Sequence, residues 1–279
     1  MNMREAAVKA WAGIWYVVYV VLRVLLRLLI GKHRRGWVLY ILGLHYSRAY
    51  SARYGSLFAR YEPHVYRVVR NVLRRKDSKS FIDVGAFKGW YTIYAYKILR
   101  KKSRFTIVAV EPDPRNYKML CKTTQSVTGI QLVDEAVFIK DGEYVEFHVG
   151  KSHVALNGFA DAGSVAPTNW HVRDGYLTGE VIKVKSVRLD TLIRRSGLEK
   201  VDLVKMDIEG AEYPVLTDPT LDLSKVENII VEVHYRYGSR ESWEIMQALA
   251  RRGFKIVPLY PEPNSNRFHL LACKGEVPW

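Results

Sequence analysis

Cysteine is scarce in this chain, which has only Cys121 and Cys273 among its 279 residues. Two cysteines so far apart form neither a disulfide framework nor the paired spacing of a structural zinc site, and a reduced interior suits them best. Hydrophobic residues make up 48% of the chain, which is enough to bury a sizeable core. We therefore expect one domain with an extension.

Acidic residues are scarce in the first part of the chain. Residues 1–80 hold 16 Lys and Arg but only 3 Asp and Glu, whereas residues 81–279 hold 27 and 25. Nearly all of the net charge of +15 therefore lies in an N-terminal extension, which we place at residues 1–79. Such a segment favours an anionic surface, either lipid head groups or nucleic acid. A segment that is basic for solubility alone is the alternative.

The extension also lacks an uninterrupted apolar run. Trp11–Ile30 is strongly apolar, but Arg23 and Arg27 interrupt it, and a membrane-spanning helix needs about 20 apolar residues. On a helix, the charged residues share one side, and Trp, Val, Leu and Ile occupy the other. This pattern is typical of a helix in a membrane interface, so we expect residues 1–44 to bind an anionic membrane surface from the cytoplasm. A single transmembrane helix and a helix packed on protein are the alternatives.

The rest of the chain alternates short apolar runs with helical patterns. Such alternation predicts an α/β domain with a mostly parallel sheet that helices cover on both faces. The last two strands, FKIVPLY and RFHLLACK, are separated only by PEPNSN, so they should pair antiparallel. IQLVDEAVF reads as one strand, and KDGEYVEFHV adds a turn and a second hairpin strand. Residues 149–178 have no clear period and read as a long loop.

The motif FIDVGAFKGWYT, residues 81–92, ends a strand at Asp83 and turns at Gly85 and Gly89. It is neither the G-x-G-x-x-G of dinucleotide binders nor a P-loop. Ligands of open parallel sheets bind at the carboxyl ends of strands, and a glycine leaves the backbone open to a ligand. A purely structural turn is the alternative.

Two further strand ends carry acids. Glu111 ends the second strand, where an acid accepts hydrogen bonds from the hydroxyls of a ribose. Asp134 and Glu135 end the third strand, where a carboxylate can meet an adenine amino group. Three acids around a glycine turn suit a nucleoside with a cationic tail, such as S-adenosylmethionine. Its adenosine would contact Glu111 and Glu135, and its amino-acid end would lie near Asp83 and Gly85.

Four segments in this order, FIDVGAFKGWYT, AVEPDPRNYKML, SVRLDTL and VDLVKMDIEGAEYPVL, resemble the FkbM family of S-adenosylmethionine-dependent methyltransferases. The resemblance implies a class I methyltransferase domain, Rossmann-like, with a seven-stranded mostly parallel sheet and one antiparallel edge strand, which we place at residues 80–279. It also implies O-methylation of a hydroxyl on a glycan or another small molecule, and the basic extension suggests a lipid-linked sugar as the acceptor. By this resemblance the residues around the cofactor are Asp83, Gly85, Gly89, Glu111, Glu135 and Asp207. The predicted cofactor site also includes their neighbours Ala86, Thr92, Pro112, Asp134 and Ala136.

Methyl transfer to a hydroxyl requires alignment of the acceptor and a base nearby. His234 is the expected general base because an imidazole titrates near neutral pH, and Glu209 is the alternative base. A histidine that only supports the site through Asp207 or Glu209 is the other interpretation. Lys205 is expected to form a structural ion pair with Asp207 or Glu232 rather than to act chemically. Asp207 is expected to position the cofactor.

No metal site is expected, because no second Asp-Asn pair follows a strand and the remaining histidines have no ligand spacing. These are His148, His153, His171 and His269. Within the long loop, His153 and Asn157 are candidates for substrate selection.

Two other functions stay open. An RNA methyltransferase could use the basic extension, but the fourth strand ends in Asp-Ile-Glu-Gly, without the Asn/Asp-Pro-Pro-aromatic motif typical of enzymes that methylate base amines. A catalytically inactive, membrane-associated protein on the same scaffold is the other, because a fold does not determine a function. Its intact strand-end acids argue against loss of cofactor binding.

Overall fold

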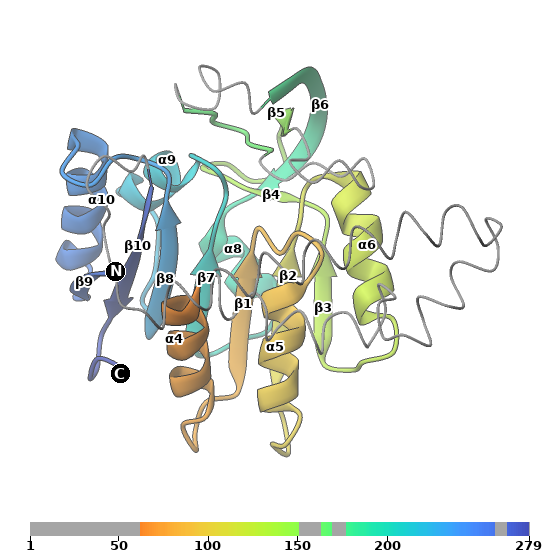
Figure 1. Cartoon of the computed structure of the whole chain (residues 1–279), viewed down its shortest axis with the longest axis vertical. Coiled ribbons are helices and arrows are strands. Elements are labelled where there is room, and N and C mark those ends of the chain that lie inside the picture. The colour runs from red at the N-terminus through yellow and green to blue at the C-terminus, as the bar shows by residue number, and fades with distance from the viewer. Residues whose placement is uncertain (1–61, 151–162, 169–176, 260–266, 279) are drawn as a thin grey trace, which may run out of the picture. The chain divides into compact units, whose positions relative to one another are not determined.

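The computed structural model describes residues 62–150, 163–168, 177–259 and 267–278 (Figure 1). The chain divides into two compact units, and the described residues belong to the second, Glu62–Trp279. This unit begins before residue 80 because helix α4 (Pro63–Leu73) packs against helix α5 (Trp90–Leu99) and strand β7 (Leu203–Met206). Residues 1–44, which predicted a membrane-interface helix, lie outside the described residues. Among the residues that are described, no helix is long and apolar enough to cross a membrane.

The domain is built on a seven-stranded sheet in the order β3-β2-β1-β7-β8-β10-β9. Its other strands are β1 (Ser80–Val84), β2 (Thr106–Val110), β3 (Ile130–Val133), β8 (Asn228–Val233), β9 (Lys255–Leu259) and β10 (Phe268–Cys273). Strand β10 runs antiparallel to both of its neighbours, β8 and β9, and the pairs from β3 to β8 are parallel. The predicted mostly parallel α/β sheet is confirmed, and its antiparallel pairing lies at one end.

Helices cover both faces of this sheet, which explains why its strands are apolar on both sides. On one face, Ile82 and Val84 of β1 pack in a core with α8 (Leu189–Arg195), α9 (Glu212–Thr217) and α10 (Arg240–Arg251). On the other face, α4 and α5 lie side by side against the middle of the sheet (Figure 1). Helix α6 (Pro114–Thr124) packs there against β2.

The face under α4 and α5 carries a row of polar side chains near the carboxyl ends of β1, β7 and β8. Asp83 of β1 pairs in register with Lys205 of β7, and Glu232 of β8 pairs with His269 of β10. Lys205 is the register partner of Ile230, which lies two residues before Glu232, so all four side chains point to the same face. Asp83, Lys205 and Glu232 are buried, and His269 is nearly so. We call these four residues the buried polar row.

A small second sheet has the order β4-β6-β5 and lies above the main sheet in Figure 1. Its strands are β4 (Ala136–Val137), β5 (Tyr144–Gly150) and β6 (Leu177–Val187). The predicted hairpin within residues 130–148 is wrong, because IQLVDEAVF divides into β3 and β4 and β5 pairs antiparallel with β6. Asp141 explains part of this outcome, since its carboxylate accepts hydrogen bonds from the Arg188 N–H and the Thr191 hydroxyl and so attaches the turn to α8.

The turn after β1 generates a test of packing at the strand ends. Gly85 has a φ of +75°, and a Cβ built on it would lie 1.8 Å from the carbonyl oxygen of Asp207. We expect Gly85→Ala to lower the free energy of unfolding by about 3 kcal/mol or more, since the β7 backbone must move. The matched control is Gly142→Ala, where φ is +72° but no atom lies within 4 Å of the built Cβ.

In the control variant, the free energy of unfolding falls only because alanine must adopt a left-handed backbone conformation, which costs about 1–2 kcal/mol. Chemical denaturation of both variants measures the difference. Equal losses would contradict the close approach of the two strand ends.

Candidate active site

The carboxyl ends of β1, β2, β7 and β8 bring most of the predicted site residues together. Strands β1, β7 and β8 are adjacent and parallel, so residues that follow them meet at one edge of the sheet. The residues gathered there are Asp83, Gly85, Lys205, Asp207, Glu209 and His234.

The end of β1 presents a buried carboxylate. The Thr92 hydroxyl donates a hydrogen bond of 2.6 Å to Oδ2 of Asp83, so fully buried Thr92 acts on the site through Asp83. Oδ1 of Asp83 is buried and has no hydrogen-bond partner among the described residues. Burial raises the pKa of Asp83, whereas Lys205 opposes this rise. An unsatisfied acceptor in this position fits the ammonium group of an amino-acid ligand.

Lys205 connects the ends of β1 and β7. Its Nζ lies 3.1 Å from Oδ2 of Asp207, 3.3 Å from the carbonyl oxygen of Gly85 and 3.9 Å from Oδ1 of Asp83. Burial alone lowers the pKa of this lysine, but Asp207 and then Asp83 outweigh burial and raise it. The ammonium therefore stays charged, as its expected role in an ion pair with Asp207 requires.

The end of β2 presents Glu111, which is buried. Its carboxylate accepts hydrogen bonds from the backbone N–H groups of Phe87 at 2.8 Å and Asp113 at 3.0 Å, and from the side chain of Asn116. A carboxylate offers about four lone pairs, so one remains for a ribose hydroxyl. Burial raises the pKa of Glu111 to about 7.

The end of β3 differs in part from the expectation. Glu135 forms ion pairs with Arg195 at 2.6 Å and with Lys185 at 3.7 Å, so two cationic side chains already compensate its negative charge. Glu135 nevertheless lines a pocket of about 500 Å³ together with Pro112 and Asp134. Tyr117, Leu132, Tyr144 and Lys183 also line it. Ala136 is buried in the core of the small sheet and does not line this pocket.

His234 is fully buried between two carboxylates. Its Nε2 lies 3.1 Å from Oε2 of Glu209, and its Nδ1 lies 3.0 Å from Oε1 of Glu212. Burial alone lowers the pKa of His234, but Glu209 and Glu212 outweigh burial and raise it well above its usual range. The two carboxylates therefore favour the charged form of the ring, and Nδ1 lies within hydrogen-bond distance of Glu212.

Glu212 was not predicted as a site residue. It is fully buried, and its two oxygens accept hydrogen bonds from the backbone N–H groups of Ile208 and Gly210. A glutamate just inside α9 that reaches back to the preceding loop resembles a capping box, which was the available signal in IEGAE. Glu209 in the same turn has a φ of +54°, and non-glycine residues in this region are often found at functional sites.

Part of the predicted long loop lies against this turn. The Ser164 hydroxyl lies 3.5 Å from the carbonyl oxygen of Ile208, and a Cβ on Gly210 would lie 2.6 Å from the carbonyl oxygen of Ala166. Residues 163–168 therefore cover the end of β7. His153 and Asn157 lie outside the described residues.

Within the part of the chain that the structure describes, two sets of side chains could hold a metal ion, although the sequence predicted none. They are Asp207, Glu232 and His234, and Glu62, Glu232 and His269. No sequence pattern indicated the second set, because Glu62, Glu232 and His269 are far apart along the chain and form no short metal-binding motif. The register of β8 with β10 brings it opposite Glu232.

Comparison with known proteins identifies the domain. Residues 83–256 match the model of the methyltransferase FkbM domain. The 2-O-methyltransferase NoeI of Sinorhizobium fredii is 25% identical over 182 residues, which are 64% of this chain and 71% of NoeI. Methyltransferase 1 of Beauveria bassiana is 25% identical over 210 residues, which are 71% of this chain and 82% of that protein.

Solved structures that match this chain include the methyltransferase FkbM of Methylobacillus flagellatus KT, with a TM-score of 0.42 and 15% identity over 80% of this chain and 54% of that chain. Fibrillarin of Aeropyrum pernix, solved with bound S-adenosyl-L-methionine, has a TM-score of 0.42 and 13% identity over 75% of this chain and 74% of its own. The family model covers more than half of the chain from Asp83 onward. The chain therefore belongs to the FkbM family and is a methyltransferase that uses S-adenosylmethionine.

Proposed function

We propose that this methyltransferase acts on a hydroxyl of a glycan, a lipid-linked sugar or another small molecule. The observation that carries the proposal is the pair of carboxylates, Asp207 and Glu209, at the end of β7 beside the turn at Gly85. A hydroxyl must lose its proton as it is methylated, and a carboxylate close by can accept that proton. The relative NoeI, named as a 2-O-methyltransferase, supports the same reaction type.

The residues of the β1 and β2 ends fit S-adenosylmethionine, which when bound supplies a methyl group on a sulfonium. In this proposal Glu111 accepts a hydrogen bond from a ribose hydroxyl with its remaining lone pair. The unsatisfied Oδ1 of Asp83 accepts one from the amino group of the methionine part. The pocket beside Pro112 and Asp134 holds the adenine.

Glu209 rather than His234 is the base that we propose. His234 would need to be neutral in order to accept a proton, and the two carboxylates that flank it favour its charged form. His234 is then a positioning residue, because its N–H groups hold Glu209 and Glu212 in place. Asp207, paired with Lys205, positions the cofactor.

The cofactor assignment predicts a loss of affinity in Glu111→Ala. Hydrogen bonds to charged groups contribute about 1.5–3 kcal/mol, so the Kd for S-adenosylmethionine should rise by about 10–100-fold. Calorimetric titration measures this value. Glu146→Ala, which removes an exposed carboxylate from β5, serves as the matched control and should bind like the wild type. An unchanged Kd in Glu111→Ala would remove Glu111 from the cofactor site.

The choice of base predicts that Glu209→Gln binds the cofactor normally but transfers methyl groups about 10²–10⁴-fold more slowly. Labelled S-adenosylmethionine is incubated with sugars, lipid-linked glycans and RNA, and products are identified by mass spectrometry. Methyl ethers are the expected products. Methylated base amines would contradict the proposal.

The variant His234→Gln distinguishes between His234 and Glu209 as the general base. Under this proposal it weakens transfer less than Glu209→Gln does, because the carboxylate that takes the proton is retained. A larger loss of methyl-transfer rate in His234→Gln than in Glu209→Gln would indicate that His234 is the general base.

We also propose that residues 1–44 bring the enzyme to an anionic membrane surface. The support is the basic and apolar pattern of this segment. Each Lys or Arg near such a surface contributes about 1 kcal/mol of attraction, so binding should be strong on vesicles with phosphatidylserine and weak on neutral vesicles. Vesicle flotation at low and high salt measures this difference. Equal flotation with both lipids would argue against an electrostatic contact.

A further inference from the structure

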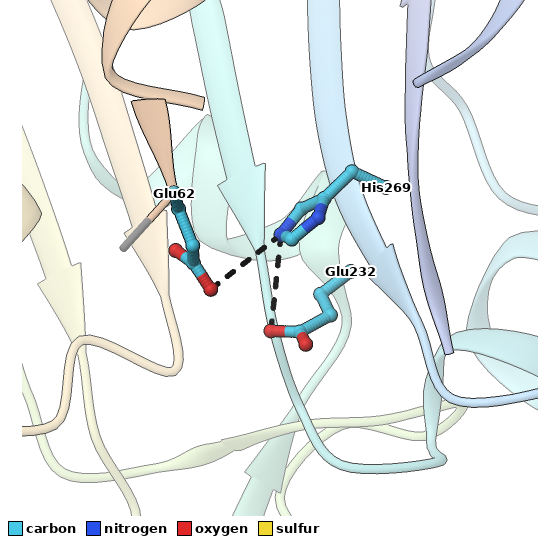
Figure 2. Close-up of side chains that lie close together, drawn as sticks. All are labelled: Glu62, Glu232 and His269. Carbon is cyan, nitrogen blue, oxygen red and sulfur yellow. Dashed lines mark ion pairs between the residues drawn. The ribbon is translucent and has the colours of Figure 1, made fainter. Parts of the chain in front are cut away.

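A second group of polar side chains lies beside the cofactor site, on the face of the sheet that α4 covers. Glu62 is the residue just before α4, Glu232 belongs to β8 and His269 belongs to β10. Figure 2 shows the two carboxylates and the imidazole turned toward one another. Nε2 of His269 lies 3.8 Å from Oε1 of Glu62 and 3.9 Å from Oε2 of Glu232. One ligand atom from each residue lies within 4.8 Å of the others.

These separations fit a single bound cation. Zinc–nitrogen and zinc–oxygen bonds are about 2.0–2.2 Å long, so two ligands of one ion lie about 3.3–3.6 Å apart in a tetrahedron and about 4.4 Å apart at most. The separations from His269 fall between these values. Small side-chain shifts would therefore complete the coordination.

The charges of the group also favour a cation. Oε1 of Glu62 and Oε2 of Glu232 both face Nε2 of His269. The Arg267 guanidinium lies 3.3 Å from Glu232, and the Tyr91 hydroxyl donates a hydrogen bond to Glu62. Glu232 is buried and Glu62 is partly exposed. Two such neighbouring carboxylates repel each other when both are ionised, and a divalent ion between them removes that cost.

The surroundings of His269 suit a metal ligand. Its side chain is mostly buried, with 13% of its surface exposed. Its Nδ1 lies 2.9 Å from Nε2 of His64. If Nδ1 carries the proton and donates it to His64, the lone pair of Nε2 faces the two carboxylates. Metal-binding histidines usually donate their other ring N–H to a partner in this way.

We propose that Glu62, Glu232 and His269 bind a divalent transition-metal ion, with His64 orienting His269. One imidazole nitrogen and two carboxylate oxygens suit Zn²⁺ or Mn²⁺ better than Mg²⁺ or Ca²⁺, which prefer oxygen ligands alone. Such an ion connects the start of α4 to β8 and β10. Of the three proposed ligands, Glu232 lies within the matched family segment, residues 83–256, and Glu62 and His269 lie outside it.

The other candidate set, Asp207, Glu232 and His234, suits a cation less well. Both ring nitrogens of His234 already face carboxylates, since Nε2 lies 3.1 Å from Glu209 and Nδ1 lies 3.0 Å from Glu212. A metal ion at this ring would have to displace one of these contacts.

Metal binding is tested on the full-length protein without any acceptor, so the result is independent of the proposed reaction. The protein is treated with a chelator and then titrated with MnCl₂ and with ZnCl₂ by calorimetry, and bound metal is counted by mass spectrometry. We expect one ion per chain in the wild type and loss of this ion in Glu62→Gln and His269→Asn. His64→Asn should weaken binding by about 10–100-fold, as is typical for a partner of a metal ligand.

The matched controls Glu146→Gln and His148→Asn remove the same groups from β5 and should bind metal like the wild type. Absence of binding by the wild type would overturn the proposal, and so would unchanged affinity in Glu62→Gln and His269→Asn. An ion that Asp207→Asn loses but Glu62→Gln keeps would assign the metal to the other set of ligands and equally overturn it.

Binding of S-adenosylmethionine shows which variants are folded. Should the ligand variants fail this check, electron spin-echo spectra of the Mn²⁺-loaded wild type decide the question. We expect coupling to one imidazole nitrogen, and a spectrum without nitrogen coupling would rule out His269 as a ligand.

Discussion

A buried ammonium group holds the two central strand ends of this domain together. Lys205 lies between the carboxylates of Asp83 and Asp207 and also contacts the carbonyl oxygen of Gly85. Breaking a buried ion pair by removing one partner costs about 3–5 kcal/mol, so the turn after β1 and the end of β7 form one unit. Asp83 extends that unit to Thr92 at the start of α5. The positions of the turn at Gly85 and of the Asp-Ile-Glu-Gly loop after β7 both depend on this contact.

The main sheet and its strand-end acids could be predicted from sequence because they follow from local patterns. Strands covered on both faces must be apolar throughout, so an acid such as Asp83 or Glu111 at the end of an apolar run stands out. The partner of β5 could not be predicted in this way. A short turn at Asp141 and Gly142 predicts a local hairpin, whereas β6 lies more than 30 residues later and its pairing is visible only in three dimensions.

The position of the site could be predicted from the sequence, but the charge states of its residues could not. His234 could be placed at a strand end, but its charge depends on Glu209 and Glu212, whose approach follows from the turn before α9. The meeting of Glu62 with His269 depends on the order of β8 and β10 and on the packing of α4. No spacing along the chain encodes contacts between residues so far apart.

Helix α4 has a practical consequence for producing this enzyme in shortened form. Val65, Val68, Val69 and Val72 of this helix are buried, and Glu62 at its start contacts Tyr91 and His269. A chain cut at residue 80, as sequence periodicity suggests, would leave the apolar surface under α4 exposed to water and prone to aggregation. Expression of the catalytic unit for crystallisation should therefore begin before Glu62, well upstream of the matched family segment.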